Sequence, residues 1–197
     1  MITQADLTVL DWIQENLRCG FLDTVTPFIT GLAEYGMLWI ILALCLMIYP
    51  KTRKAGAAVA IALVLELILC SGILKPLFAR PRPYLYRPEL ELLVPKPWDF
   101  SFPSGHAAAS FSAACALAAM RQRGWLVALG LSVLIGLTRL YLFVHYPTDV
   151  LAGALLGLLC GLAGAFLVSW SCATVEKWKN GPDSSAPEHG QEKTHKS

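Results

Sequence analysis

The sequence predicts an all-α protein, a polytopic transmembrane helical bundle of about five to six spans with an N-terminal interfacial helix. Hydrophobic residues make up 55% of the 197 residues and charged residues only 15%, which is too apolar for an ordinary soluble domain. The net charge of +2 is small and gives no indication of a nucleic-acid partner. We divide the chain into N-terminal interfacial and partly embedded helices (1–34), a transmembrane core (35–174) and a polar, disordered cytoplasmic tail (175–197).

The N-terminal region contains two short segments with different patterns. Residues 4–18 place most of their apolar side chains on one helical face, which predicts an amphipathic helix lying along the membrane interface. Residues 21–34 contain Pro27, end at Glu34 and are too short and polar to be a clear span. We predict a partly embedded helix there, with a true span as the alternative.

Five apolar runs follow, and each predicts a helix of the core. They are 36–49, 55–74, 107–120, 125–137 and 150–172. The second and the last are rich in Gly and Ala, which suits close packing of helices. Glu66 interrupts the second run about 13 Å of helix rise from Lys75, and we favour a structural role for it. The six cysteines lack metal-site spacing, and we assign them no function.

The basic residues predict how the bundle is oriented. The links 51–54 and 121–123 are basic, and further lysines follow the last apolar run. If the five runs all span the membrane, these cations share one side, and the positive-inside rule makes that side cytoplasmic. The opposite side then carries the loop 75–104 and the stretch 138–149. That loop is also basic, although the positive-inside rule disfavours cations on this side. We therefore expect its cations to have a function of their own.

The first stretch of chemical interest is KPLFARPRP, which begins at Lys75. Lys75 ends the second apolar run, and Arg82 stands between two prolines. Prolines restrict the backbone and lower the entropy cost of presenting a guanidinium group at a fixed angle. The alternative is a basic patch that binds anionic headgroups without specificity, and Arg80 and Arg87 fit that alternative better.

The second stretch is SFPSGHAAAS, at 101–110. Ser104 is a plausible N-cap, and Gly105 allows a close approach of the backbone. The free N–H groups at a helix start, together with the helix dipole, favour an anion, and His106 sits at that start. The alternative is an ordinary N-cap with a surface histidine.

The third stretch is TRLYLFVHYPTD, at 138–149. Arg139 can bind two phosphate oxygens, His145 can attack or move a proton, and Asp149 is close enough in sequence to hold the imidazole in one tautomer. Alone, the stretch also fits a helix end with an arginine that reaches for water. The predicted topology brings all three stretches to one membrane face, and together they indicate a phosphate-processing site.

The spacing of these residues resembles a known family signature. Six residues separate Lys75 from Arg82-Pro83, the second stretch contains Pro-Ser-Gly-His, and in the third stretch Arg139, His145 and Asp149 are separated by five and three residues. This pattern is similar to the three-part signature of the type-2 phosphatidic acid phosphatase superfamily, which includes lipid phosphate phosphatases and vanadium haloperoxidases. Thr138 stands where the family usually has serine; the hydroxyl is retained, so we expect little loss.

The resemblance implies a role for each residue. His145 would be the nucleophile that forms a phosphohistidine, Asp149 would orient it, and His106 would protonate the leaving oxygen. The residues that would bind the phosphoryl oxygens are Lys75, Arg82, Ser104, Gly105 and Arg139. We expect no metal and no cofactor, because the cations can stabilise the transition state and no Asp/Glu cluster suited to Mg²⁺ is evident.

The function that we expect from the resemblance is hydrolysis of a lipid phosphate or diphosphate ester at the extracytoplasmic face of a bacterial inner membrane. Small members of the family resemble undecaprenyl-diphosphate phosphatases and phosphatidylglycerophosphate phosphatases, and the sequence does not choose between them. A phosphotransferase using the same site is an alternative. A non-catalytic lipid-binding or transport protein is less favoured because the catalytic positions are intact. The oligomeric state is open.

Overall fold

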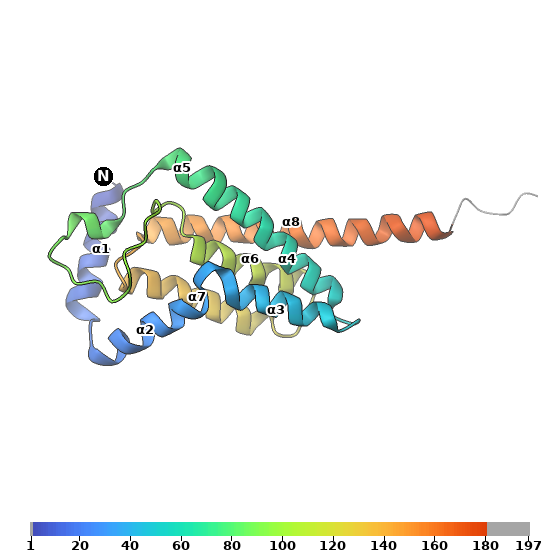
Figure 1. The fold of residues 1–197 in the computed structure, drawn as a ribbon, viewed down its shortest axis with the longest axis horizontal. Coiled ribbons are helices and arrows are strands. Elements are labelled where there is room, and N and C mark those ends of the chain that lie inside the picture. The colour runs from blue at the N-terminus through green and yellow to red at the C-terminus, as the bar shows by residue number, and fades with distance from the viewer. Residues whose placement is uncertain (1, 181–197) are drawn as a thin grey trace, which may run out of the picture.

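A computed structural model of the chain describes residues 2–180, and every regular element in that part is helical (Figure 1). The elements in order are α1 Ile2–Asn16, α2 Gly20–Leu32, the short 3-10 helix η1 Glu34–Gly36, α3 Met37–Ile48, α4 Arg53–Leu67, the π-helix η2 Ile68–Leu74, α5 Lys75–Phe78, the 3-10 helix η3 Pro83–Tyr86, α6 Gly105–Ala119, α7 Trp125–Tyr141 and α8 Pro147–Asn180. The predicted all-α class is confirmed.

Three helical stretches of the described chain are long and apolar enough to cross a membrane: Gly20–Ile48, Arg53–Tyr86 and Pro147–Glu176. The helices α6 and α7 are apolar but shorter. The segment that we expected to be partly embedded, 21–34, forms α2 and continues through η1 into α3 as one apolar stretch. The number of spans therefore stays a prediction, whereas helices do occupy all five apolar runs of the core.

The helix α6 lies at the centre of the bundle, between α4, α7 and α8 (Figure 1). Its buried side chains are mostly alanine and serine, among them Ala108, Ser112 and Ala116. Small side chains let the neighbouring backbones come close, which replaces side-chain interdigitation by direct helix contact.

Glycines of α8 make the closest of these approaches. Gly153, Gly157 and Gly161, each one turn after the last, face α6, and Gly164 faces α4. A methyl group on Gly157 would lie 2.4 Å from the carbonyl oxygen of Ala108. The predicted close packing of the last apolar run is confirmed.

Gly157→Ala is therefore expected to push α8 away from α6 and lower the free energy of unfolding by about 1–3 kcal/mol. Thermal unfolding of the purified protein in detergent measures this. Gly130→Ala on α7 is the matched control, because a methyl group there meets no atom within 4 Å. Equal melting temperatures for the two variants would contradict the contact.

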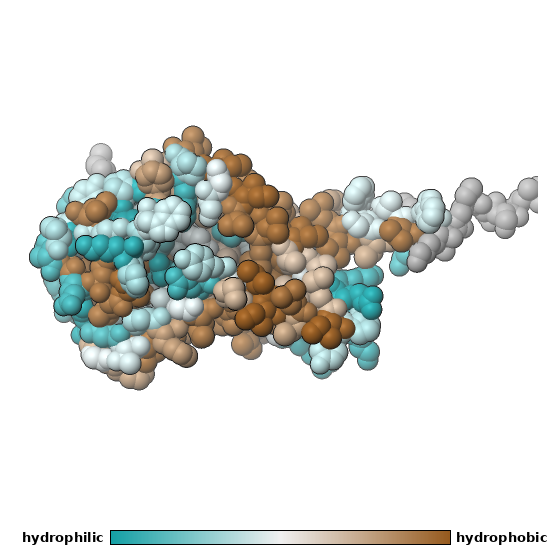
Figure 2. All heavy atoms as spheres, in the orientation of Figure 1, coloured by the Kyte–Doolittle hydropathy of each residue, from teal (hydrophilic) through white to brown (hydrophobic). Residues whose placement is uncertain are grey.

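Exposed aliphatic and aromatic side chains gather around the middle of the bundle, as the brown surface on the face in Figure 2 shows. They come from α3, α4, α7 and α8 and include Ile41, Leu44, Val64, Leu67, Val127, Leu137, Leu155 and Phe166. A surface of this kind is stable in lipid and not in water. The chain is an integral membrane protein.

The helix α8 is longer than the bilayer requires. Its 34 residues extend about 51 Å, against a hydrocarbon core of about 30 Å, and its C-terminal part projects beyond the other helices (Figure 1). Residues 175–180, which we assigned to the tail, are helical, so that boundary was wrong. The remainder of the predicted tail, 181–197, lies outside the described residues.

Different segments of the chain form the two ends of the bundle. The α3–α4 and α6–α7 links and the C-terminal part of α8 lie toward one end, while α1 and the loop between α5 and α6 lie at the other (Figure 1). The basic links thus lie toward the same end of the bundle, and their side of the membrane stays a prediction. Leu7 and Leu10 of α1 are buried against Phe143 and Tyr146. The apolar face of α1 thus packs against the rest of the protein.

Candidate active site

Lys75 is the first residue of α5, directly after the π-helix η2 at the end of α4. Its side chain is buried, and its Nζ lies 4.0 Å from the position that a Cβ on Gly105 would take. The ammonium group is therefore at the N-terminus of α6. A π-helical turn shifts the residues that follow it onto a different face of the helix. Lys75 directly follows such a turn, η2.

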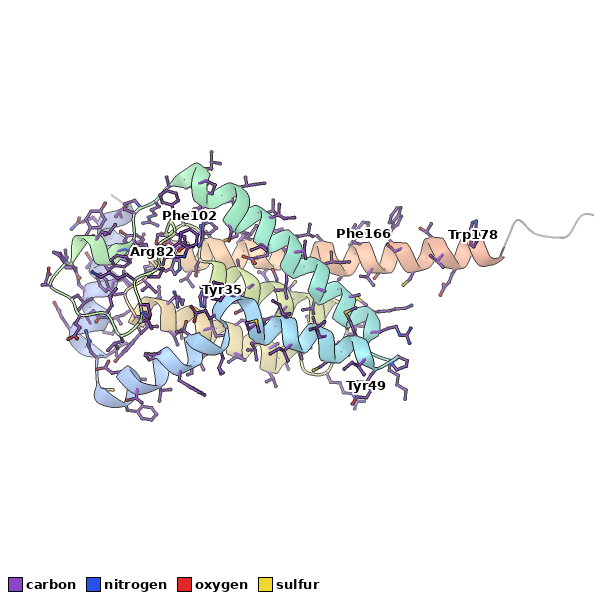
Figure 3. The ribbon with its side chains drawn as sticks, viewed as in Figure 1. Tyr35, Tyr49, Arg82, Phe102, Phe166 and Trp178 are labelled. Carbon is purple, nitrogen blue, oxygen red and sulfur yellow. The ribbon has the colours of Figure 1, made fainter. Side chains whose placement is uncertain are left out.

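Arg82 connects the loop to the turn before α8. Its Nη1 donates a hydrogen bond to the carbonyl oxygen of Val144 (2.8 Å) and lies 3.3 Å from Nε2 of His145. Its Nε donates to the carbonyl oxygen of Asp99 (2.8 Å). The residue is buried at the loop end of the bundle, far from Tyr49 at the other end (Figure 3).

The start of α6 is built as predicted. The hydroxyl oxygen of Ser104 accepts a hydrogen bond from the backbone N–H of Ala107 (3.5 Å), so Ser104 is the N-cap. The backbone N–H of Ser104 donates to the carbonyl oxygen of Asp149 (3.0 Å), which ties this helix start to the start of α8. Gly105 and His106 are the first two residues of the helix. His106 lies within electrostatic range of Lys75, Arg82, Arg139 and His145.

His145 is almost fully buried, with its Nδ1 3.6 Å from Oδ2 of Asp149. Arginine has only donors, so the contact from Arg82 requires Nε2 to be an acceptor and places the imidazole proton on Nδ1, toward Asp149. Burial, and then the positive charges of Arg82, Arg139 and Lys75, lower the pKa of His145 well below its ordinary value. A neutral imidazole whose Nε2 is unprotonated can act as a nucleophile at neutral pH once a substrate takes the place of the hydrogen bond from Arg82.

Asp149 has no exposed surface, and three groups hold its carboxylate. Ser101 donates its hydroxyl to Oδ2 (2.5 Å), as does the backbone N–H of Tyr146 (3.1 Å). Arg80 pairs with Oδ1 (2.6 Å). A buried carboxylate satisfied in this way keeps one fixed orientation.

The structure contradicts our interpretation of Arg80 and Arg87 as cations for lipid headgroups. Arg80 pairs with Asp149 and, through Nη2, with Asp6 of α1 (2.7 Å), and its guanidinium lies over the ring of Tyr146. Arg87 pairs with Asp11, also on α1 (2.6 Å). Both arginines thus hold α1 onto the end of the bundle, which the sequence pattern did not reveal because the acidic partners are about 75 residues away.

Arg139 is buried in the last turn of α7. Its Nη1 donates to the hydroxyl oxygen of Thr30 on α2 (2.7 Å), and its Nε has no hydrogen-bond partner. Unpaired donors on a buried guanidinium are costly. A phosphoryl oxygen would supply the missing partner.

Sequence reasoning missed Asp99, which lies between two of the predicted phosphate-binding cations. Its carboxylate pairs with Nζ of Lys75 and with Nη2 of Arg82. Burial alone would raise the pKa of Asp99, but the hydrogen bonds and charges of Lys75 and Arg82 outweigh it and lower the pKa to about 2. The signal that could have found it is its position, an acidic residue two before the Ser-Phe-Pro-Ser-Gly-His stretch in a basic loop.

Comparisons with known proteins identify the family of this chain. Residues 52–173 match the family model of the PAP2 superfamily, which is more than half of the chain. The chain belongs to the PAP2 superfamily.

Two PAP2-type relatives illustrate the range of the likeness. The chain is 36% identical to undecaprenyl-diphosphatase of Sulfolobus acidocaldarius over 138 residues, which cover 68% of this chain and 66%, about two thirds, of that protein. It is 35% identical to decaprenylphosphoryl-5-phosphoribose phosphatase of Mycobacterium tuberculosis over 170 residues, which cover 80% of this chain and 88% of that protein.

Two solved structures share the PAP2 fold. LpxE of Aquifex aeolicus matches with a TM-score of 0.68 and 29% identity, covering 80% of this chain and 93% of that one. The phosphatidylglycerolphosphate phosphatase of Bacillus subtilis matches with a TM-score of 0.68 and 26% identity, covering 88% and 87%. With relatives named as lipid phosphatases, this chain is a PAP2-type phosphatase.

In this PAP2 site Asp6 of α1 pairs with Arg80 and accepts hydrogen bonds from the backbone N–H and the hydroxyl of Thr148, so it acts on Asp149 through these neighbours and is a positioning residue. We expect Asp6→Asn to weaken the hold on Arg80 and thereby on Asp149, and to lower kcat about tenfold at an unchanged KM. Steady-state kinetics of phosphate release measures both constants. Asp11→Asn is the control, because its pair with Arg87 lies on a more exposed surface. Equal losses in both variants would contradict a path through Arg80.

Proposed function

We propose that this protein hydrolyses a lipid phosphate or diphosphate ester through a phosphohistidine intermediate, without a metal ion, at the extracytoplasmic face of the membrane. The observation that carries the proposal is the position of His145. Its Nε2 lies 3.3 Å from Nη1 of Arg82, and the charge of Lys75 also acts on the ring. A nucleophile surrounded by phosphate-binding cations fits phosphoryl transfer, whose transition state requires mainly positioning and charge stabilisation.

The first step forms a bond between Nε2 of His145 and phosphorus, while the bond from phosphorus to the lipid oxygen breaks. His106, at the first turn of α6, donates a proton to that leaving oxygen. The carboxylate of Asp149, 3.6 Å from Nδ1 of His145, stabilises the positive charge that develops on the ring. Water then attacks the phosphohistidine, with His106 accepting its proton, and inorganic phosphate leaves.

The phosphoryl oxygens are bound by groups that already converge. Nζ of Lys75 lies 4.0 Å from the Cβ position of Gly105 at the start of α6, Arg82 reaches from the loop, and Arg139 has a free donor at Nε. Ser104 caps the same helix start. These cations supply the positive charge that a divalent metal supplies in other phosphoryl-transfer enzymes.

The side of the membrane follows from the distribution of cations. The basic links lie toward the end of the bundle opposite the site, and the positive-inside rule assigns such links to the cytoplasm. We therefore assign the site to the outer side of a bacterial inner membrane. In protein whose six native cysteines are replaced by serine, Glu89→Cys should react with a membrane-impermeant reagent added to intact cells and Arg53→Cys should not; the reverse pattern would overturn the assignment.

The test of the function is phosphate release by the purified protein from a panel of lipid phosphates and diphosphates. Undecaprenyl diphosphate and phosphatidylglycerophosphate come first, since relatives are named for acting on such lipids. We expect turnover that survives EDTA and is inhibited by vanadate, a mimic of the transferring phosphoryl group. A strict Mg²⁺ requirement would count against the metal-free site. Transfer of phosphate to an added lipid alcohol instead of water would favour a phosphotransferase.

A further inference from the structure

The carboxylate of Asp99 occupies donors that the proposed reaction needs for phosphate. One oxygen pairs with Nζ of Lys75 and the other with Nη2 of Arg82. Carboxylate and phosphate are recognised by the same groups, and arginine binds both through paired N–H groups. A phosphoryl group and the Asp99 carboxylate therefore cannot both hold these donors in the geometry observed.

Asp99 is also placed where it can withdraw. It lies in the irregular segment before α6, and its side chain keeps about a third of its surface exposed, at 31%. Its neighbours Trp98 and Phe100 are both exposed. Its main-chain oxygen accepts a separate hydrogen bond from Nε of Arg82, so the segment can stay attached while the carboxylate turns away.

A lipid phosphate and free phosphate would both compete with this carboxylate, but their total binding energies differ. A lipid phosphate brings additional binding energy from its hydrocarbon tail, whereas free phosphate binds only through its oxygens. An internal anion that must be displaced therefore weakens both ligands, but it leaves free phosphate too weakly bound to block the site.

We propose that Asp99 is a specificity-determining residue, a resident anion that competes with phosphate for Lys75 and Arg82, so that the site accepts lipid-linked phosphate and releases the free phosphate product. The inference rests on the proposed function. The opposite role is a brace that holds Lys75 and Arg82 ready for phosphate. The two roles predict changes of opposite sign when the carboxylate is removed.

The experiment compares binding of inorganic phosphate to the purified full-length wild type and Asp99→Asn by titration calorimetry, which needs no turnover. We expect Asp99→Asn to bind phosphate on the order of tenfold more tightly. The inhibition constant of phosphate in the lipid assay should fall to the same extent. Unchanged or weaker phosphate binding would overturn the proposal and leave Asp99 as a brace.

Two further variants keep the comparison sharp. Glu89→Gln removes one negative charge from the same loop at an exposed position and should leave phosphate binding at the wild-type value. If Asp99→Asn does not give folded protein, Asp99→Ser replaces it with the same expected sign. A wild type that releases phosphate from no lipid would refute the proposed function, whatever Asp99→Asn binds; an active wild type with no gain in Asp99→Asn refutes this inference alone.

Discussion

His145→Gln is expected to reduce phosphate release on the order of 10³-fold or more, because glutamine has nearly the same reach as histidine but no nucleophilic nitrogen. The loss should be in kcat, since the cations that bind phosphate remain. The direct measurement is acid-labile, base-stable labelling of the protein by a substrate with radioactive phosphorus. We expect label on the wild type and none on His145→Gln.

The control for this change is His189→Gln, which alters a histidine outside the three stretches of the predicted site and should leave the turnover rate at the wild-type value. Unaltered melting of His145→Gln would show that the fold is retained. Near-normal turnover in a folded His145→Gln protein would refute the nucleophile.

Arg82→Lys is expected to lower kcat/KM about 100-fold although the positive charge is kept. The guanidinium of Arg82 contacts His145, the carbonyl oxygen of Val144 and both the carbonyl and the carboxylate of Asp99 at the same time. These partners lie in different directions, so the single ammonium group of a lysine cannot contact all of them at once. Kinetics of phosphate release and a melting curve separate lost catalysis from lost folding.

Arg87→Lys is the matched control, because Arg87 belongs to the same loop but pairs with Asp11 on a more exposed surface. We expect it to retain wild-type kcat/KM within about twofold, as exposed ion pairs contribute little. Similar losses in Arg82→Lys and Arg87→Lys would mean that the loop needs arginines for its shape and not for the reaction.

The helices and the principal site residues could be predicted because their signals are local. Apolar runs mark the helices, and the spacing from Arg139 to His145 and Asp149 lies within one stretch of chain. The N-cap at Ser104 also depends only on its neighbours in sequence. The structure confirms the cap and brings Lys75 next to Gly105.

The supporting contacts could not be predicted because they join distant segments. The partner of Arg80 on α1 is Asp6, and the partner of Arg139 on α2 is Thr30. An acidic residue such as Asp99 in a basic loop has several possible partners, and only the fold selects Lys75 and Arg82. Local patterns therefore predict which residues react, and tertiary contacts decide how each is held.

The glycines of α8 have a consequence for changing the substrate range. Because Gly153 and Gly157 set α8 directly against the backbone of α6, the helix starts that bear His106 and Asp149 form a stiff platform with little room for adjustment. Adaptation to a bulkier or shorter headgroup must then come from the parts that rest on this platform. Libraries aimed at new lipids should vary residues 85–98 and leave the α6–α8 seam untouched.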